Sequence, residues 1–294
     1  MRVTNQMMTN HAIQNMAESL ETLQRLSERA ANGKRFQSAS EDPAAASTSL
    51  NLRSVLQAAK SYQFTIDRTN DWMNANEFSL QRAGELALRA ENLIQRGLND
   101  TLSAEERQTA LATELDGLIQ QVVDLANTTH NGQYIFAGYQ VKTAPIELTD
   151  PNTIPYHGDQ GEISQSIDSG QHVEMNLRAD AVFQPLLEAM IAARNELNEN
   201  DLTGLRAAFD TLKTASDGID QFRTANGARL NQMKDHTSYL EKVELEVKAL
   251  LTKNEGVNMA EAISLYKSQE TVYQSVIEVS QRSISAMNLF DYLR

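Results

Sequence analysis

Two long stretches of this chain, residues 52–94 and 205–250, carry apolar residues at alternating spacings of three and four. In an α-helix this spacing places the apolar side chains in one stripe along one face, as in coiled-coil packing. At 1.5 Å per residue, each stretch predicts a helix of roughly 65 Å. Helices of this length favour a rod over a globule with a cleft.

The segment between the two stretches has a different pattern. Over residues 130–183, five glycines and three prolines separate short apolar runs such as 134–136 and 163–167. These runs predict short strands joined by turns. The fold class that follows is mainly α: a long antiparallel helical hairpin or coiled-coil bundle with a small inserted β domain. The acidic, turn-rich composition of the insert predicts an outer knob that is peripheral to the helices.

Start and stop signals mark the remaining helices and the loops between them. Gly33 is expected to close the first helix, and Asp42 and Pro43 are expected to cap and begin the long helix after a loop over 34–41. Ser103 and Glu106 have the spacing of a capping box. The additional helices are expected over residues 4–31, from Ser103 onward, over 185–198 and over 259–292.

We therefore divide the chain into three expected domains. A terminal helical domain combines residues 1–40 with 257–294, a helical rod domain combines 41–129 with 184–256, and the β domain covers 130–183. The terminal helices have thin apolar stripes, so burial between them offsets little of the ordering entropy of about 1–2 kcal/mol per residue. They are expected to become ordered when they pack against copies of themselves or against a partner.

The nearly equal lengths of the two arms predict the register of the hairpin. Facing residues should have numbers that sum to roughly 298, within one or two helical turns. Met73 should then lie near Ala225, Asn76 near Asn226, and Leu23 near residue 275. Thr69 and Asn76 interrupt one apolar stripe, and Asn226 and Arg229 interrupt the other. Because unpaired polar groups in a seam are costly, these residues are expected to meet each other or water.

Composition excludes several classes of protein. The net charge is −13, which argues against a nucleic-acid-binding face. The chain has no cysteine, so disulfides, thiolate catalysis and thiolate metal sites are excluded. It has no segment like a signal peptide and no apolar stretch near the ~20 residues of a membrane span. If the protein is exported, we expect a route without a cleaved signal.

Sites for catalysis, cofactors or metals are not expected. The five histidines show no pair at ligand spacing on one helix, and phosphate-loop, nucleophile-elbow and dinucleotide motifs are missing from the sequence. The run from Tyr156 to Asp159 is best interpreted as a turn between strands. We therefore expect a structural protein rather than an enzyme.

Several motifs resemble known sequences. Leu26-Ser27, the run Gly33–Phe36 and the run Ala39–Ala44 are similar to the helix–loop–helix signature of the flagellin superfamily, with Phe36 where Ile is usual and Glu41 where Asp is usual. Four further motifs resemble the superfamily's hook–filament junction subunits: Gly132–Gly138, Tyr156–Gly161, Asn226–Arg229 and Leu289–Leu293. The resemblance covers nearly the whole chain.

This resemblance implies an axial subunit of the bacterial flagellum, located outside the cell. The implied partners are hook-associated protein 1, flagellin, copies of itself in a ring and a flagellar export chaperone, with secretion through the flagellar type III system. A flagellin-like filament subunit remains an alternative, as does a secreted coiled-coil effector. Partner contacts within the inner tube are expected at Ile13, Leu20, Leu23, Val272, Val276 and Leu289, and the loop joining inner and outer parts is expected to be shaped by Arg35, Asp42 and Pro43.

Overall fold

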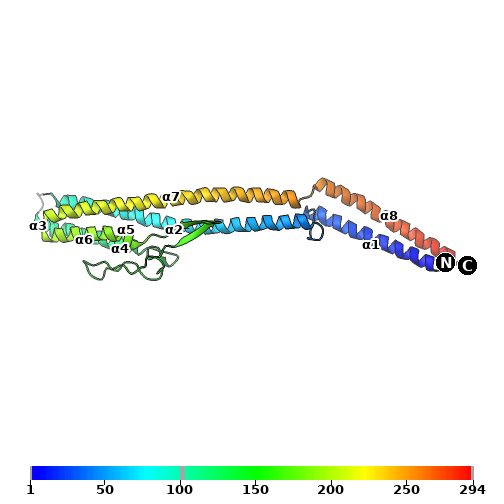
Figure 1. Cartoon of the computed structure of the whole chain (residues 1–294), viewed down its shortest axis with the longest axis horizontal. Coiled ribbons are helices and arrows are strands. Elements are labelled where there is room, and N and C mark those ends of the chain that lie inside the picture. The colour runs from blue at the N-terminus through cyan, green and yellow to red at the C-terminus, as the bar shows by residue number, and fades with distance from the viewer. Residues whose placement is uncertain (1, 100–102, 293–294) are drawn as a thin grey trace. The chain divides into compact units, whose positions relative to one another are not determined.

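The computed structural model describes the backbone of residues 2–99 and 103–292 and the side chains of residues 6–99 and 103–282. Most of the described chain is helical (Figure 1). The helices are α1 (Arg2–Asn32), α2 (Pro43–Gly97), α3 (Ala104–Glu106), the π-helical turn η1 (Arg107–Leu111), α4 (Ala112–Ala126), α5 (Ala179–Val182), α6 (Gln184–Glu199), α7 (Leu202–Glu255) and α8 (Met259–Tyr292). The predicted fold class, mainly α with a small inserted β region, is confirmed.

The strands lie between α4 and α5 and form two antiparallel hairpins. β1 (Thr129–His130) pairs with β2 (Gln133–Tyr134), and β3 (Ser164–Asp168) pairs with β4 (Gln171–Glu174). The predicted strand at 163–167 is confirmed within one residue. The strand predicted at 134–136 ends at Tyr134, because Ile135 and Phe136 leave the ladder and become buried.

The chain divides into two compact units. One contains Met1–Gln57 and Val243–Arg294, and the other contains Ala58–Lys242. Both divisions fall inside a continuous helix, in α2 and in α7. Each unit has its own packing, described in turn.

In the unit of residues 58–242, α2, α4, α6 and α7 share one apolar core. Their fully buried side chains recur at helical spacing, which explains why these segments form amphipathic helices. Ala83, Ala87 and Ala90 are completely buried on α2, and such small residues allow neighbouring helices to approach closely. The core also includes Leu80, Ile94, Leu115, Leu118, Val122, Leu186, Met190, Leu205 and Leu212.

The antiparallel pairing of α2 with α7 is confirmed in this unit. Asn226 Nδ2 donates to the carbonyl oxygen of Met73 over 3.1 Å, and Arg223 Nε lies 3.1 Å from Glu77 Oε1. Residues 73 and 226 were expected to face each other within about one turn, and they do. The hairpin therefore has the predicted register at this level.

The polar residues of the seam do not meet each other as expected. Asn76 Nδ2 donates to the carbonyl oxygen of Met175 over 2.9 Å, and Arg229 forms an ion pair of 2.8 Å with Glu174. His236 Nε2 lies 2.9 Å from Gln171 Oε1. These interruptions of the apolar stripes mark where the β3–β4 hairpin and the chain after it contact the helices.

The β insert packs against the helices, although its composition suggested a peripheral knob. Ile167 and Val173 belong to a buried cluster with Met73 and Met233. Phe136 is fully buried, and its ring contacts that of Phe183 with centroids 4.8 Å apart. Two-stranded hairpins bury too little area to be stable alone, so their apolar side chains pack on the helices instead.

The link between α2 and α4 contains an expected cap and an unexpected turn. Glu106 N donates to Ser103 Oγ over 3.2 Å and Ser103 N donates to Glu106 Oε2 over 3.0 Å, which confirms the capping box. The π turn η1 follows. Its buried Arg107 donates to the carbonyl oxygens of Gly97 and Asn99, over 2.8 and 2.9 Å. The sequence did not predict this turn.

Candidate assembly surfaces

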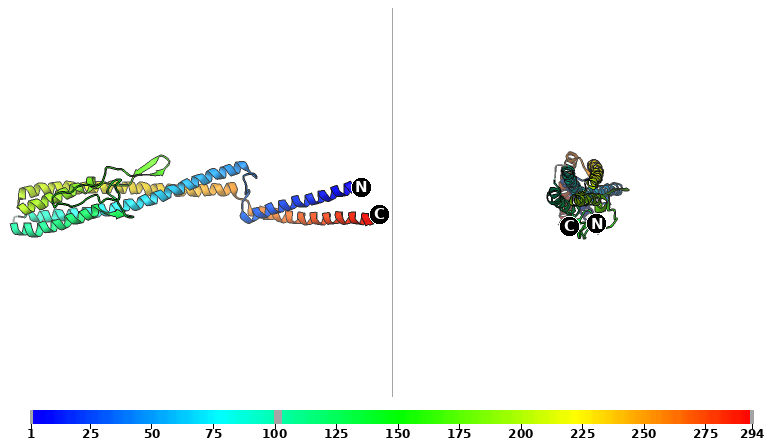
Figure 2. Two further views of the ribbon diagram at one scale, coloured as in Figure 1. Left: turned by 90° about the horizontal axis from the view of Figure 1, so that it is seen from below. Right: turned by 90° about the vertical axis from the view of Figure 1, so that its left-hand side faces the viewer.

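The terminal helices α1 and α8 run side by side (Figures 1 and 2). Ser19 is buried between them, and Gln269 Nε2 donates to its hydroxyl over 3.2 Å. This contact places Leu23 at the level of about residue 265, so the predicted pairing with residue 275 is wrong. The loop between α1 and α2 covers residues 33–42, whereas the loop between α7 and α8 covers only residues 256–258. Because the two loops differ in length, the register of α1 against α8 differs from that of α2 against α7.

The residues predicted to contact partners divide into two groups by exposure. Ile13, Leu20 and Val272 have exposed fractions of 54%, 38% and 46%. Leu23 and Val276 are half-buried. Leu289 falls in the part of α8 where the side chains lie outside the described residues.

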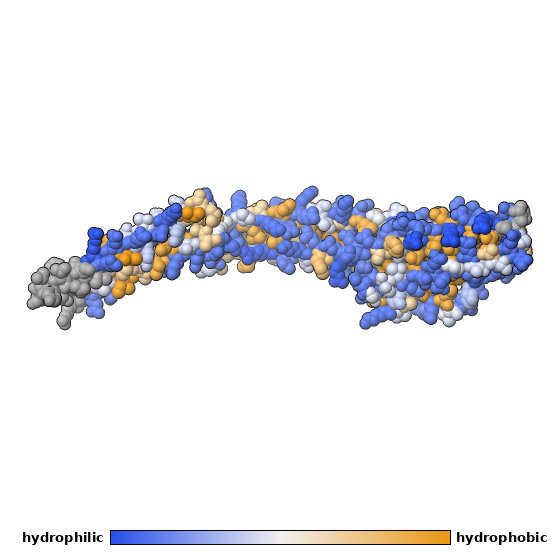
Figure 3. Space-filling model, turned by 180° about the vertical axis from the view of Figure 1, so that it is seen from behind, coloured by the Kyte–Doolittle hydropathy of each residue, from blue (hydrophilic) through white to orange (hydrophobic). Residues whose placement is uncertain are grey.

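The exposed apolar side chains of this helix pair form a larger set than the sequence predicted. Hydrophobic residues, in orange, gather along the described part of the pair in Figure 3. A groove of about 610 Å³ is lined largely by small residues of α8. Val272, Val276 and Val279 contribute to it at spacings of four and three, the pattern that receives another helix. The other exposed apolar residues of the pair include Met7, Met8, Ile263 and Leu265.

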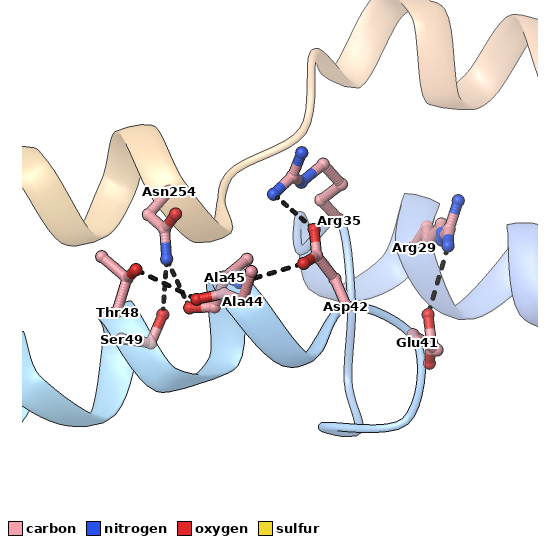
Figure 4. Close-up of polar contacts among 9 residues, drawn as sticks. All are labelled: Arg29, Arg35, Glu41, Asp42, Ala44, Ala45, Thr48, Ser49 and Asn254. Carbon is pink, nitrogen blue, oxygen red and sulfur yellow. Dashed lines mark hydrogen bonds and ion pairs between the residues drawn. The ribbon is translucent and has the colours of Figure 1, made fainter.

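Hydrogen bonds and ion pairs between residues close in sequence hold the loop between α1 and α2, as the sequence predicted (Figure 4). Gly33 adopts a left-handed φ of +67°, which closes α1. Asp42 Oδ1 accepts a hydrogen bond of 2.9 Å from Ala45 N, and Pro43 is the first residue of α2. Arg35 forms an ion pair of 3.1 Å with Asp42. The three predicted loop residues therefore lie together.

A half-buried carboxylate beside this loop was not predicted. Glu255, whose side chain is only 12% exposed, lies 2.8 Å from Arg53 and 3.3 Å from Lys34. Its carbonyl oxygen accepts a 2.6 Å hydrogen bond from Arg35 N, and Asn254 Nδ2 donates to Ala45 O over 2.8 Å. About 200 residues separate these partners in the chain, so no local pattern could have revealed them.

The electrostatics of the loop favour ionised carboxylates. Burial pushes the pKa of Glu255 upward, but hydrogen bonds from Arg53, Ser49 and Lys34 outweigh it and hold this pKa below its usual range. A hydrogen bond from Arg29 likewise lowers the pKa of Glu41. A carboxylate with a lowered pKa stabilises the folded state at neutral pH, and this contribution is lost as the pH falls through the lowered value.

We therefore predict that acid loosens this loop through Glu255. Below about pH 4.5, the reference value of its pKa, hydrogen exchange of the amides at 35 and 257, corrected for intrinsic rates, should accelerate. Glu255→Gln should already show the faster exchange at pH 7. The control Glu85→Gln removes an exposed i,i+3 ion pair and should change nothing here. Equal exchange in Glu255→Gln and the unsubstituted chain at pH 7 would contradict the prediction.

The described residues hold no group of three or more metal-ligating side chains. The segment expected to be a turn begins with an isolated bridge: Tyr156 pairs with Ile146, and its hydroxyl donates to Asp159 O over 2.8 Å across the bend at Gly158. Burial and the charge of Asp180 raise the pKa of Tyr156 to about 12, so it remains a hydrogen-bond donor. None of the described helices contains a stretch long and apolar enough to cross a membrane.

Comparisons with a family profile and with known proteins point to the same family. The profile of the bacterial flagellin N-terminal helical region matches residues 3–141. The flagellar hook-associated protein 3 of Salmonella typhimurium is 29% identical over the full length of both chains. That of Escherichia coli is 32% identical, covering 73% of this chain and 67% of the relative.

A solved structure shows the same fold at lower identity. The flagellar junction protein FlgL from Legionella pneumophila superposes with a TM-score of 0.58 at 16% identity, covering 72% of this chain and all of that one. This likeness shows the fold, and the sequence comparisons show the family. The chain belongs to the flagellar hook-associated protein 3 family and is a structural component of the bacterial flagellum, assembled outside the cell.

Proposed function

We propose that this chain joins the flagellar hook to the flagellin filament. The observation that carries the proposal is the apolar face of α1 and α8, where Ile13, Leu20 and Val272 are exposed to solvent. A large exposed apolar face is typical of an interaction surface. The similarity to hook-associated protein 3 over the whole chain supports the flagellum as the place where this face is covered.

In this proposal the terminal helices of several copies pack together as a ring that continues the inner tube. Residues 1–40 and 257–294 act as the assembling domain, and the loop with Arg35, Asp42 and Pro43 connects it to the remaining helices. Hook-associated protein 1 contacts one side of the ring and flagellin contacts the other. Full burial of an exposed Ile or Val side chain contributes about 1.5–3 kcal/mol, so each of these half-exposed residues contributes less, and several per copy are needed to offset the cost of association.

The proposed route of secretion comes from the similarity to flagellar hook-associated protein 3 and is compatible with the composition of the chain. We propose that the chain leaves through the flagellar type III system, escorted by a dedicated chaperone that covers the terminal helices. A chain without cysteine needs no disulfide formation after export. A two-helix terminal domain with exposed apolar residues gains most of its packing only on assembly, which suits passage in an unfolded or partly folded form.

The test is deletion of the gene followed by electron microscopy. The deletion strain should carry hooks without filaments and release flagellin into the medium, and the intact gene should restore filaments. If the protein is instead a filament subunit, the deletion strain should lack flagellin in the medium or grow filaments with altered subunits. Normal filaments in the deletion strain would contradict the proposal.

A further inference from the structure

A cavity in the unit of residues 58–242 is separate from the assembly surfaces. It measures about 560 Å³, within the range of about 300–1,000 Å³ typical of ligand pockets. Helix α2 contributes Phe64, Arg68 and Trp72 to its lining, and the loop after β2 contributes Tyr139. These residues belong to the unit of residues 58–242, whereas α1 and α8 belong to the other unit.

The sequence motifs around this cavity hold Tyr139 in one orientation. Tyr139 is 64% exposed, yet its hydroxyl donates to Glu162 O over 3.0 Å and its backbone N donates to Asp159 Oδ1 over 2.7 Å. Asp159 Oδ1 also accepts from Gly161 N over 2.9 Å. A side chain on Gly161 would collide with the Tyr139 ring. The Tyr156–Gly161 motif and the adjacent Glu162 thus build a rigid support for an exposed ring.

A rigid, exposed aromatic side chain favours binding more than folding. Its ring adds little to the core while it remains in water, but its orientation is fixed before any ligand arrives, so little conformational entropy is lost on binding. Phe64, also 64% exposed, lines the same cavity and carries the Arg68 guanidinium 5.9 Å from its ring centre. The cavity thus presents two aromatic faces to solvent.

The remaining lining groups define the chemistry of the ligand. Trp72 is 6% exposed, and its indole N–H has no acceptor among the described residues. Asp71, Asn131, Gln133 and Gln165 add carboxylate and amide groups to the lining. An apolar side chain from a protein partner would leave these polar groups desolvated without partners, which is unfavourable. A phosphate-bearing ligand would need more cationic groups than Arg68 and His130 provide.

We propose that this cavity binds a saccharide. A sugar ring has an apolar face that can stack on Phe64 and Tyr139, and hydroxyl groups that can pair with Asp71, Asn131 and Gln133. The volume accommodates one or two rings. Because the protein is assembled outside the cell, the site meets glycans of surfaces and secretions. The proposal does not depend on the junction role.

The chain carries its own reporter for this site. Trp72 is the single tryptophan of the sequence and lines the cavity, so its fluorescence should respond to binding without any label. We would titrate the purified full chain with maltotriose, chitotriose and lactose, each up to the millimolar range, and confirm binding by calorimetry. At least one of these sugars should shift the emission with saturation.

Three variants decide between stacking and a nonspecific effect. Tyr139→Ala should weaken binding about tenfold or more, since an aromatic anchor is lost. Tyr139→Phe keeps the ring but loses the hydrogen bond to Glu162, so it should weaken binding by a smaller factor. Phe78→Ala removes an aromatic side chain of similar exposure, 62%, that does not line the cavity, and it should bind normally.

Three results would overturn the proposal. The first is a failure of all three sugars to bind at millimolar concentration. The second is binding that is unchanged in Tyr139→Ala while circular dichroism shows an intact fold. The third is a Trp72 emission shift that accompanies self-assembly and is abolished by Tyr139→Ala in the absence of sugar, which would assign the cavity to contact with a second copy.

Discussion

Phe136→Ala should lower the free energy of unfolding by about 3–5 kcal/mol. Phe136 is fully buried, its ring meets Phe183 edge to face, and its carbonyl oxygen accepts a 2.9 Å hydrogen bond from Ala179 N. The substitution leaves a cavity where the β insert meets the helices and removes the aromatic pair. Chemical denaturation followed by circular dichroism at 222 nm measures the loss, because that signal reports the helices rather than the insert.

The matched control is Phe78→Ala, which removes the same side chain from an exposed position on α2. A surface substitution of this kind should change the stability by no more than about 0.5 kcal/mol. If Phe136→Ala were as mild as Phe78→Ala, the insert would be peripheral, as its composition alone suggested. A large loss in helical stability establishes that insert and helices unfold as one cooperative body.

The double substitution Ile13→Asp and Val272→Asp should abolish incorporation of the protein into the flagellum. Both side chains are about half exposed in the isolated chain, so the monomer loses little stability. In an assembled ring, two buried charges without partners would each cost several kcal/mol, more than the contacts they replace can offset. Motility on soft agar and electron microscopy of a complemented deletion strain measure the effect, with secretion of the variant checked in the medium.

The control for this pair is Asn10→Asp combined with Gln274→Asp. It adds the same two charges to the same two helices at exposed polar positions and removes no apolar side chain. These cells should remain motile. Motility in the Ile13/Val272 variant at normal secretion would show that these residues do not lie in the assembled interface.

The long helices could be predicted because their signals are local and repeated. Alternating apolar spacings extend through most of α2 and α7. Asp42 and Pro43 mark the start of α2, and the Ser103–Glu106 capping box marks the start of α3. Each of these features depends on residues a few positions apart, which is what a sequence displays directly. The pairing of α2 with α7 followed from the similar lengths of the arms.

The packing of the insert could not be predicted, because it depends on contacts between distant segments. Ile167 in β3 and Val173 in β4 are apolar residues between polar neighbours, as in any short strand. Nothing in that pattern shows that they pack on Met73 and Met233. Composition described the solvent-facing residues of the insert correctly but not its apolar side. The polar residues of the seam were identified, but their partners on the β3–β4 hairpin were not.

The exposed apolar face of the terminal helices was predicted in part, and its role in assembly stays a prediction. Ile13, Leu20 and Val272 follow from the apolar stripes, and they are exposed as an unpartnered face requires. The error in the α1–α8 register arose from treating the two connecting segments as equal in length. Glu255 escaped prediction because a single acidic residue at the end of a helix gives no sign that Lys34 and Arg53 converge on it.

The most direct test of the junction role is the position of the protein on the flagellum. An epitope inserted at the exposed turn of Ser169 and Gly170, between β3 and β4, can be detected by immunogold electron microscopy on intact flagella. We predict a single band of label where hook and filament meet, with none along the filament. Label distributed along the filament would contradict this account and would instead identify a filament subunit.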